Sequence, residues 1–337
     1  MSERFSLPGF VNAHSHAFQR RLRGRAEGGD FWAWREVMLD LASGLSATQV
    51  RRDYTVTYRE MRAAGYTAVG EFHYLGFEEA EAALAAADEA GIAIVLLYAA
   101  YARGGLARFR QPSVAAYLRD LERLRGRGAV ALAPHSVRAC PPDWLAELGR
   151  YAEREELVLH VHADEQPREV DECVAENGFR PIEVLARTGC LGPRTTVVHA
   201  THADDRELDL LAEAGARICV CPTTEANLGD GFLPVARVRG RGIQLCIGSD
   251  SNVRIDPLEE LRELEGIARR QELRRNVLRP DELLSIGADA GAAALGLARW
   301  DAIDIDLAHP SLSGVAREDV RAALVFGCAG DVFARPW

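Results

Sequence analysis

Two histidines separated by one residue, His14 and His16, follow an apolar run at residues 5–11. On a β-strand, residues two apart project from the same face, so both imidazoles can aim at one point. Imidazole nitrogens bind zinc and similar divalent cations. The pair is therefore a candidate for half of a metal site, although a His-x-His pair alone is a weak signal.

Residues later in the chain could complete such a site. His162 offers a third nitrogen, and Glu165, three residues further on, could reach a water at the metal without being a ligand. Asp250 offers a carboxylate ligand, and His199 ends another apolar run. A divalent cation acidifies water toward neutral pH, and a nearby carboxylate can carry the proton to a leaving nitrogen. These residue types indicate a hydrolase whose leaving group is nitrogen.

The pattern of apolar residues predicts the elements that carry these side chains. Short apolar runs alternate with longer amphipathic runs, which indicates parallel β/α units, and eight such units favour a closed (β/α)8 TIM barrel. An open doubly wound sheet is the alternative, but no GxGxxG turn follows the first strand. The expected strands are residues 7–16, 67–74, 92–100, 130–135, 157–162, 195–200, 216–221 and 243–249. The expected helices are residues 48–64, 78–90, 113–126, 142–155, 168–188, 205–214, 256–272 and 282–297.

The chain shows no internal repeat, low-complexity segment or linker. We therefore expect one barrel domain over residues 1–300, followed by a C-terminal tail, residues 301–337, that packs on the barrel and includes a short strand near residues 301–307.

The candidate residues fall where a barrel would use them. Active-site residues of β/α barrels lie at the carboxyl ends of the strands, and eight of the nine histidines follow or end a predicted strand. Asp250, after the last strand, would meet the first strand where the barrel closes. Structural histidines are the competing interpretation, and we expect it to apply to His202, to His309 in the tail, and to His160, which we predict to point toward the helices.

Composition excludes several kinds of chemistry. The 40 basic residues are all arginine, which rules out a P-loop, a Schiff-base lysine, a pyridoxal phosphate anchor and a carbamylated lysine between two metals. A net charge of −10 argues against nucleic acid as a partner. The sequence contains neither a long apolar run nor a signal peptide, and its seven irregularly spaced cysteines suggest no disulfide framework. We expect a cytoplasmic protein that does not bind membranes.

Taken together, these motifs resemble the mononuclear branch of the metal-dependent amidohydrolase superfamily, and within it the formimidoylglutamate deiminases of histidine breakdown. The resemblance covers most of the chain, from residue 12 to about residue 265. The segments that carry it are NAHSHAFQR, FWAWRE, AGYTAVGEFHY, APHSVRA, HVHADEQPREVDEC, VVHATHAD, CPTTEANLGDG and GSDSNVRIDPLEELRELE.

The resemblance implies a role for each matching residue. One zinc ion, or another divalent metal such as iron, would be held by His14, His16, His162 and Asp250. Glu165 would move the proton, while His199 and Asp250 would orient the attacking water. The residues implied to bind the substrate are Gln19, Arg35, Tyr74, His135 and Arg138. The implied reaction is the zinc-dependent hydrolysis of N-formimidoyl-L-glutamate to N-formyl-L-glutamate and ammonia, and arginine suits this dianion because its planar fork binds carboxylates in pairs.

The chain departs from the family in one respect. Its members carry more sequence before the His-x-His pair, which pairs with C-terminal strands in a small β domain. We therefore expect that domain to be reduced or absent, and the apolar surface it would cover to be buried in a homodimer or made polar. Two alternatives remain open: deamination of a nucleobase or related heterocyclic amine, and a barrel that binds a ligand without catalysis.

Overall fold

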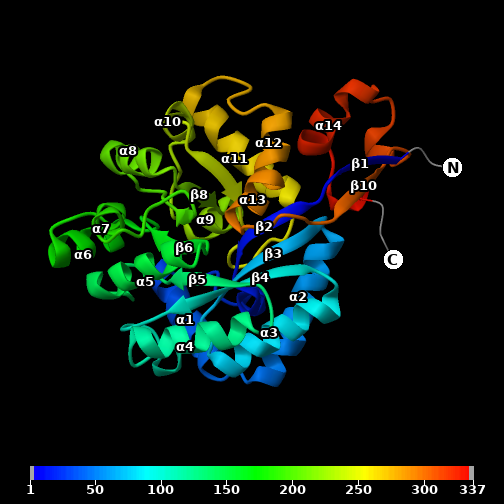
Figure 1. Cartoon of the computed structure of the whole chain (residues 1–337). Helices are drawn as coiled ribbons and strands as arrows, with labels where there is room; N and C mark the ends of the chain where they lie inside the picture. The colour runs from blue at the N-terminus through cyan, green and yellow to red at the C-terminus, as the bar shows by residue number, and fades with distance from the viewer. Residues whose placement is uncertain (1–3, 334–337) are drawn as a thin grey trace.

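The computed structural model describes residues 4–333. Its main feature is an eight-stranded parallel sheet in the order β2-β3-β4-β5-β6-β7-β8-β9, wrapped by helices (Figure 1). The strands are β2 (Phe10–Ser15), β3 (Tyr66–His73), β4 (Ala93–Ala100), β5 (Val130–Pro134), β6 (Leu159–Ala163), β7 (Thr195–His199), β8 (Arg217–Val220) and β9 (Gln244–Ile247). The predicted (β/α)8 barrel is confirmed.

The first and last strands of the sheet meet at the site where the sequence placed its candidate ligands. Ser15 and Asp250 form a parallel bridge between the ends of β2 and β9. The amide of His16 donates to the carbonyl of Asp250 at 2.8 Å, and the amide of Asp250 donates to the carbonyl of His14 at 3.0 Å. These backbone bonds close the carboxyl end of the barrel.

Most of the helices cover the outside of the sheet. They are α1 (Phe31–Ser43), α2 (Ala47–Ala63), α3 (Phe77–Ala90), α4 (Val114–Arg125), α5 (Pro142–Arg154), α6 (Pro167–Asn177), α7 (Pro181–Arg187), α8 (Asp205–Ala214), α9 (Pro222–Leu228), α10 (Val235–Gly240), α11 (Pro257–Glu272), α12 (Pro280–Gly287), α13 (Asp289–Ala294) and α14 (Val320–Gly327). Short 3-10 segments lie at Ala17–Leu22, Ala107–Phe109, Pro310–Leu312, Arg317–Asp319 and Gly330–Val332. Within residues 4–333, none of these helices has the length and hydropathy of a membrane span.

Two predicted helices are each divided in the structure. The helix expected at residues 168–188 breaks into α6 and α7 because Gly178 adopts a left-handed φ of 73° and Pro181 starts a new first turn. The helix expected at residues 282–297 breaks into α12 and α13 at Ala288, whose backbone is not helical. In both cases the apolar spacing continues across the break, so periodicity alone could not reveal it.

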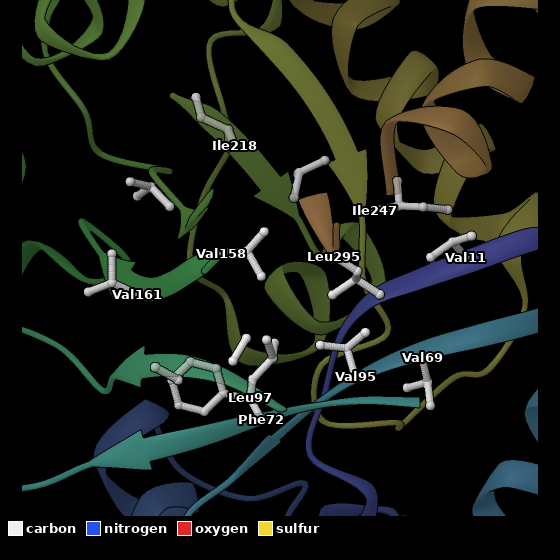
Figure 2. Close-up of a cluster of buried hydrophobic side chains, with 14 of the residues drawn as sticks. Val11, Val69, Phe72, Val95, Leu97, Val158, Val161, Ile218, Ile247 and Leu295 are labelled. Carbon is white, nitrogen blue, oxygen red and sulfur yellow. The ribbon is translucent and has the colours of Figure 1, made fainter. Parts of the chain in front are cut away.

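The amino-terminal part of the barrel is filled by the end of α13. Figure 2 shows Leu295 between side chains of the barrel strands, with Val11, Val95 and Val158 around it. The ring of His160 donates from Nε2 to the carbonyl of Ala294 at 2.9 Å. Our prediction that His160 faces the outer helices is therefore wrong: residues two apart on a strand share a face, so it points into the barrel as His162 does.

A second, two-stranded sheet lies outside the barrel. The predicted strand at residues 7–16 divides at Gly9, and its first part, β1 (Arg4–Pro8), pairs antiparallel with β10 (Ala302–Asp306). This two-stranded sheet is separate from the eight strands of the barrel. The chain then returns to the barrel, where Arg262 of α11 donates to the carbonyls of Val325 and Cys328 at 3.0 and 2.6 Å.

The tight packing at the barrel floor gives a first prediction. A Cβ on Gly70 of β3 would lie 2.5 Å from Cδ2 of Leu295 and 2.6 Å from the carbonyl oxygen of Ala13. Because the backbone cannot move aside, Gly70→Ala should lower the free energy of unfolding in urea by about 1–3 kcal/mol. Gly44→Ala, whose Cβ would meet nothing within 4 Å, is the control. Equal stability of both variants would contradict this packing.

Candidate active site and metal centre

Four side chains converge at the carboxyl end of the barrel. His14 lies on β2 and His16 directly follows it, His162 lies on β6, and Asp250 follows β9; one ligand atom from each lies within 4.8 Å of all the others. The Nε2 atoms of His14 and His162 are 3.1 Å apart, and Oδ1 of Asp250 is 3.4 Å from Nε2 of both His14 and His16. Tetrahedral ligands at zinc–nitrogen distances of about 2.0–2.1 Å are roughly 3.3 Å from one another.

Hydrogen bonds set the tautomers of two of these histidines. Nδ1 of His16 lies 2.8 Å from the carbonyl of Phe72, and Nδ1 of His162 lies 3.0 Å from the carbonyl of His135. Because a carbonyl can only accept, Nδ1 of each ring carries the proton and Nε2 presents its lone pair to the cluster. Burial lowers the pKa of His14 to about 3 and the pKa of His16 and His162 below the usual value. The imidazoles are thus neutral, as metal ligation requires.

The donor set fits a divalent cation. Three neutral imidazoles and one carboxylate, all nearly inaccessible to solvent, match the nitrogen and oxygen ligands of catalytic zinc and of similar metals. A second buried group, His199, Cys221 and Asp250, also brings its ligand atoms within 4.8 Å. His199 has other partners, however, which give it a different role.

His199 is surrounded by carboxylates. Its Nδ1 is 3.2 Å from Glu225, and its Nε2 is 3.7 Å from Glu165 and 3.9 Å from Asp250. Burial alone would lower its pKa, but the charge of Glu165 and the hydrogen bond to Glu225 raise the pKa to about 10. This shift favours the protonated ring, which can donate a hydrogen bond from Nε2 toward the metal centre.

Several residues at the carboxyl ends of the strands have a strained backbone conformation, which sets the direction of their side chains. Asp164, His199, Ala200 and Asp250 have positive φ values of 57°, 74°, 53° and 43°. Side-chain-bearing residues adopt this left-handed conformation at a cost, and such positions concentrate at functional sites. At His199, the last residue of β7, the ring faces Glu165, Glu225 and Asp250.

The residues implied to bind substrate line one cavity of about 290 Å³ beside the metal ligands. The structure brings together Gln19, Arg35, Tyr74, His135 and Arg138, with Glu165 and His199 also on the wall. Nε2 of Gln19 donates to the hydroxyl of Tyr74 at 2.9 Å. Of the neighbours His73 and Tyr74, only Tyr74 reaches the cavity, because Nδ1 of His73 lies 3.2 Å from the hydroxyl of Tyr54 on α2.

Arg138 also lies beside the candidate proton carrier. Its Nη2 is 3.7 Å from Oε2 of Glu165, and its Nε is 3.5 Å from Oε1 of the fully buried Glu169. The other oxygen of Glu169 accepts the amide of Glu165 at 3.0 Å. Glu169 thus connects the backbone of one site residue to the side chain of another.

Sequence reasoning missed both Glu169 and Glu225. Glu169 lies on α6 among several acidic residues that face solvent, so its type did not distinguish it. Glu225 belongs to CPTTEANLGDG, which reads as a loop, whereas the structure forms α9 there and turns Glu225 back toward the barrel. The available signal was an acidic residue in the segment that follows a predicted strand, at the end of the barrel where the other candidate residues lie.

An eight-stranded β/α barrel with three imidazoles and one carboxylate at its carboxyl end defines a metal-dependent hydrolase. The chain belongs to the amidohydrolase family, whose profile matches residues 5–304. It is a hydrolase acting on C–N bonds other than peptide bonds.

Two relatives of this chain act on different substrates. A formimidoylglutamate deiminase of Pseudomonas aeruginosa is 40% identical over 86% of this chain and 70% of its own length. A 5-methylthioadenosine/S-adenosylhomocysteine deaminase of Haloarcula marismortui is 29% identical over 99% of this chain and 82% of its own. Deaminase chemistry is therefore common to the relatives, while their substrates differ.

Solved structures share the fold at lower identity. An adenosine deaminase from Xanthomonas campestris with bound zinc superposes with a TM-score of 0.89 at 24% identity, over 97% of this chain and 77% of that one. The atrazine chlorohydrolase of Arthrobacter aurescens, complexed with zinc, gives a TM-score of 0.90 at 20% identity, over 98% of this chain and 82% of that one.

The two histidines of β6 allow a matched test of the metal site. His162→Gln removes a ligand and should weaken binding of Zn²⁺ or Co²⁺ by more than about 100-fold, in competition with a chromophoric chelator. His160→Gln changes the same residue type two positions away, at the barrel floor, and should keep the wild-type affinity. Similar affinities for His162→Gln and wild type would exclude His162 as a ligand.

Proposed function

We propose that the protein binds one zinc ion and hydrolyses N-formimidoyl-L-glutamate to N-formyl-L-glutamate and ammonia, a step of histidine breakdown. The observation that carries this proposal is the cavity that joins the metal ligands to Arg35 and Arg138. The 40% identity to a formimidoylglutamate deiminase supports the same substrate. Water supplies the oxygen of the new C=O bond, and its two protons leave on the amidine nitrogen as ammonia.

Zinc, when bound by the four ligands, would acidify water toward neutral pH. Glu165 then accepts a proton from the attacking water and returns it to the departing nitrogen, acting in turn as base and acid. His199, held by Glu225, donates a hydrogen bond from Nε2 to the attacking oxygen, and Asp250 faces it from the other side of the site. The burial of all three side chains excludes bulk water from the proton path.

The far end of the substrate carries two carboxylates. Arg35 and Arg138 supply the positive charge, while Gln19 and Tyr74, already hydrogen-bonded to each other, supply neutral donors. The ring of His135 lies beside the metal-ligand candidate His162, with the two ring centroids 4.8 Å apart. In a protein of net charge −10, this local group of cations would attract a dianion that the rest of the surface repels.

A second candidate is deamination of an adenosine-like heterocycle. Trp32, Trp34, Tyr101 and Phe109 line the same cavity and could stack on a planar ring. Deaminases of 5-methylthioadenosine and 5'-deoxyadenosine are among the relatives. That substrate has no carboxylate pair, so activity on it would not depend on Arg138.

We also propose a cytoplasmic location, a substrate that is a small molecule rather than nucleic acid or membrane, and a homodimeric assembly. All seven cysteines lie within residues 4–333, and each is buried and free, which suits a reducing compartment. Sedimentation velocity would decide the assembly.

Ammonia release from N-formimidoyl-L-glutamate by the zinc-loaded protein tests the proposal. At pH 8 we expect Glu165→Gln to lower kcat by about 10²- to 10⁴-fold, and Arg138→Ala to raise KM by roughly 10- to 100-fold through loss of charged hydrogen bonds. Arg237→Ala, on exposed α10, is the control. Turnover of 5'-deoxyadenosine or 5-methylthioadenosine in place of formimidoylglutamate would establish the second candidate.

The pH profile tests the role of Glu165 separately. Burial raises the pKa of Glu165 to about 7, although His199 and Arg138 act to lower it. Only the carboxylate form can accept a proton, so kcat/KM should rise with pH to about 7 and level off above it. Arg138→Gln removes one of the lowering charges and should move this limb to higher pH. A profile that is flat from about pH 5.5 to about pH 8.5 would contradict the assignment.

A further inference from the structure

Arg103 has no assigned role in the proposed reaction, but its side chain contacts the loop that carries Arg138. It follows β4 at the rim of the cavity, and its Nε donates to the carbonyl of Arg138 at 3.0 Å while Nη2 donates to the carbonyl of Val137 at 3.4 Å. Nη1 and Nη2 also bind the two oxygens of Glu176 on α6 at 2.5 and 2.9 Å. One guanidinium therefore joins three segments: the end of β4, the loop after β5, and α6.

The backbone reinforces the same connection. The amides of Ala102 and Arg103 both donate to the carbonyl of Ala139, at 2.9 and 3.1 Å. Residues 135–139, which include His135 and Arg138, are thus bound along one side by residues 102 and 103. Among residues 4–333, the Arg138 guanidinium itself has longer ion pairs, of 3.5 and 3.7 Å, to Glu169 and Glu165. The position of the Arg138 guanidinium therefore depends on the position of the residue 138 backbone.

We propose that Arg103 and Glu176 form a positioning pair that sets Arg138 for a substrate carboxylate, and so determines affinity for the acidic end of the substrate. This inference rests on the proposed function, in which Arg138 binds that carboxylate. The bidentate pair with Glu176 fixes the orientation of the Arg103 guanidinium. In that orientation, the guanidinium donates to the carbonyls of Val137 and Arg138.

Two simpler roles fit the contacts less well. The side chains of Arg103 and Glu176 are 40% and 50% exposed, and an exposed ion pair alone contributes little, but this guanidinium also binds two backbone carbonyls. A direct role in binding substrate would need a free pair of donors. Of the five N–H donors of arginine, four are used by Glu176, Val137 and Arg138.

The kinetic test uses Arg103→Ala, Glu176→Gln and the double variant, assayed with N-formimidoyl-L-glutamate. We expect each single variant to raise KM by about tenfold, with kcat changed less than about twofold. The double variant should have the same KM as Arg103→Ala, because both substitutions remove the same interaction. Arg103→Lys should recover only part of the loss, since lysine keeps the charge and lacks the fork.

A matched control lies elsewhere on the surface. Arg239 of α10 and Glu282 of α12 also form a bidentate pair, from Nε and Nη2 at 2.7 and 3.0 Å, and the Arg239 side chain is 43% exposed. Arg239→Ala should leave KM unchanged. An increase in KM for Arg103→Ala without one for Glu176→Gln would overturn the proposal in favour of direct substrate binding. Unchanged KM in both variants would reduce the pair to an ordinary surface ion pair.

Hydrogen exchange tests the pair without any substrate. The amides of Ala139 and Cys140 donate to the carbonyl of Ser136 at 3.1 and 2.9 Å, and we expect them to exchange at least severalfold faster in Arg103→Ala and Glu176→Gln than in wild type or Arg239→Ala. Unchanged exchange would refute the positioning role. If wild type fails to hydrolyse formimidoylglutamate, the proposed function fails, and exchange still decides whether the pair holds the loop.

Discussion

The closure of the barrel between β2 and β9 is the constraint on which the site depends. The backbone bonds that join His14 and His16 to Asp250 complete the cylinder, and the side chains of the same residues form most of the metal cluster. A change in the register of either strand would therefore both open the barrel and move the metal ligands apart. His162 is placed by the continuous parallel pairing that leads from β2 through β3, β4 and β5 to β6.

Around this cluster, buried acidic and basic side chains form ion pairs that share members. Glu165 lies between His199 and Arg138, and Arg138 in turn lies between Glu165 and Glu169. A charge removed from water is costly unless an opposite charge or a hydrogen bond meets it. Each of these groups therefore constrains its neighbours, which places the candidate proton carrier and the candidate substrate arginine in one electrostatic unit.

Local pattern was enough to predict the order of the elements and most of their boundaries, because alternation and helical spacing reflect which face is buried. It failed where a break keeps the spacing, as at Gly178 and Ala288, and where alternation was misjudged, as at His160. Helix α1, which brings Trp34 and Arg35 to the cavity, was not assigned as an element. The metal cluster was predictable because its histidines stand out by type at strand ends.

The sequence by itself determined the kind of chemistry: the chain has no lysine for covalent or binuclear mechanisms, and its histidines and one aspartate follow barrel strands in order. Only the tertiary structure decided which partners tune those groups. Glu169, Glu225 and the Arg103–Glu176 pair act across 4 to 73 positions in sequence. Their acidic and basic types are common on any solvated surface, so what distinguishes them is the distance to their partners and, for Glu169 and Glu225, burial. Both become defined only when the barrel closes.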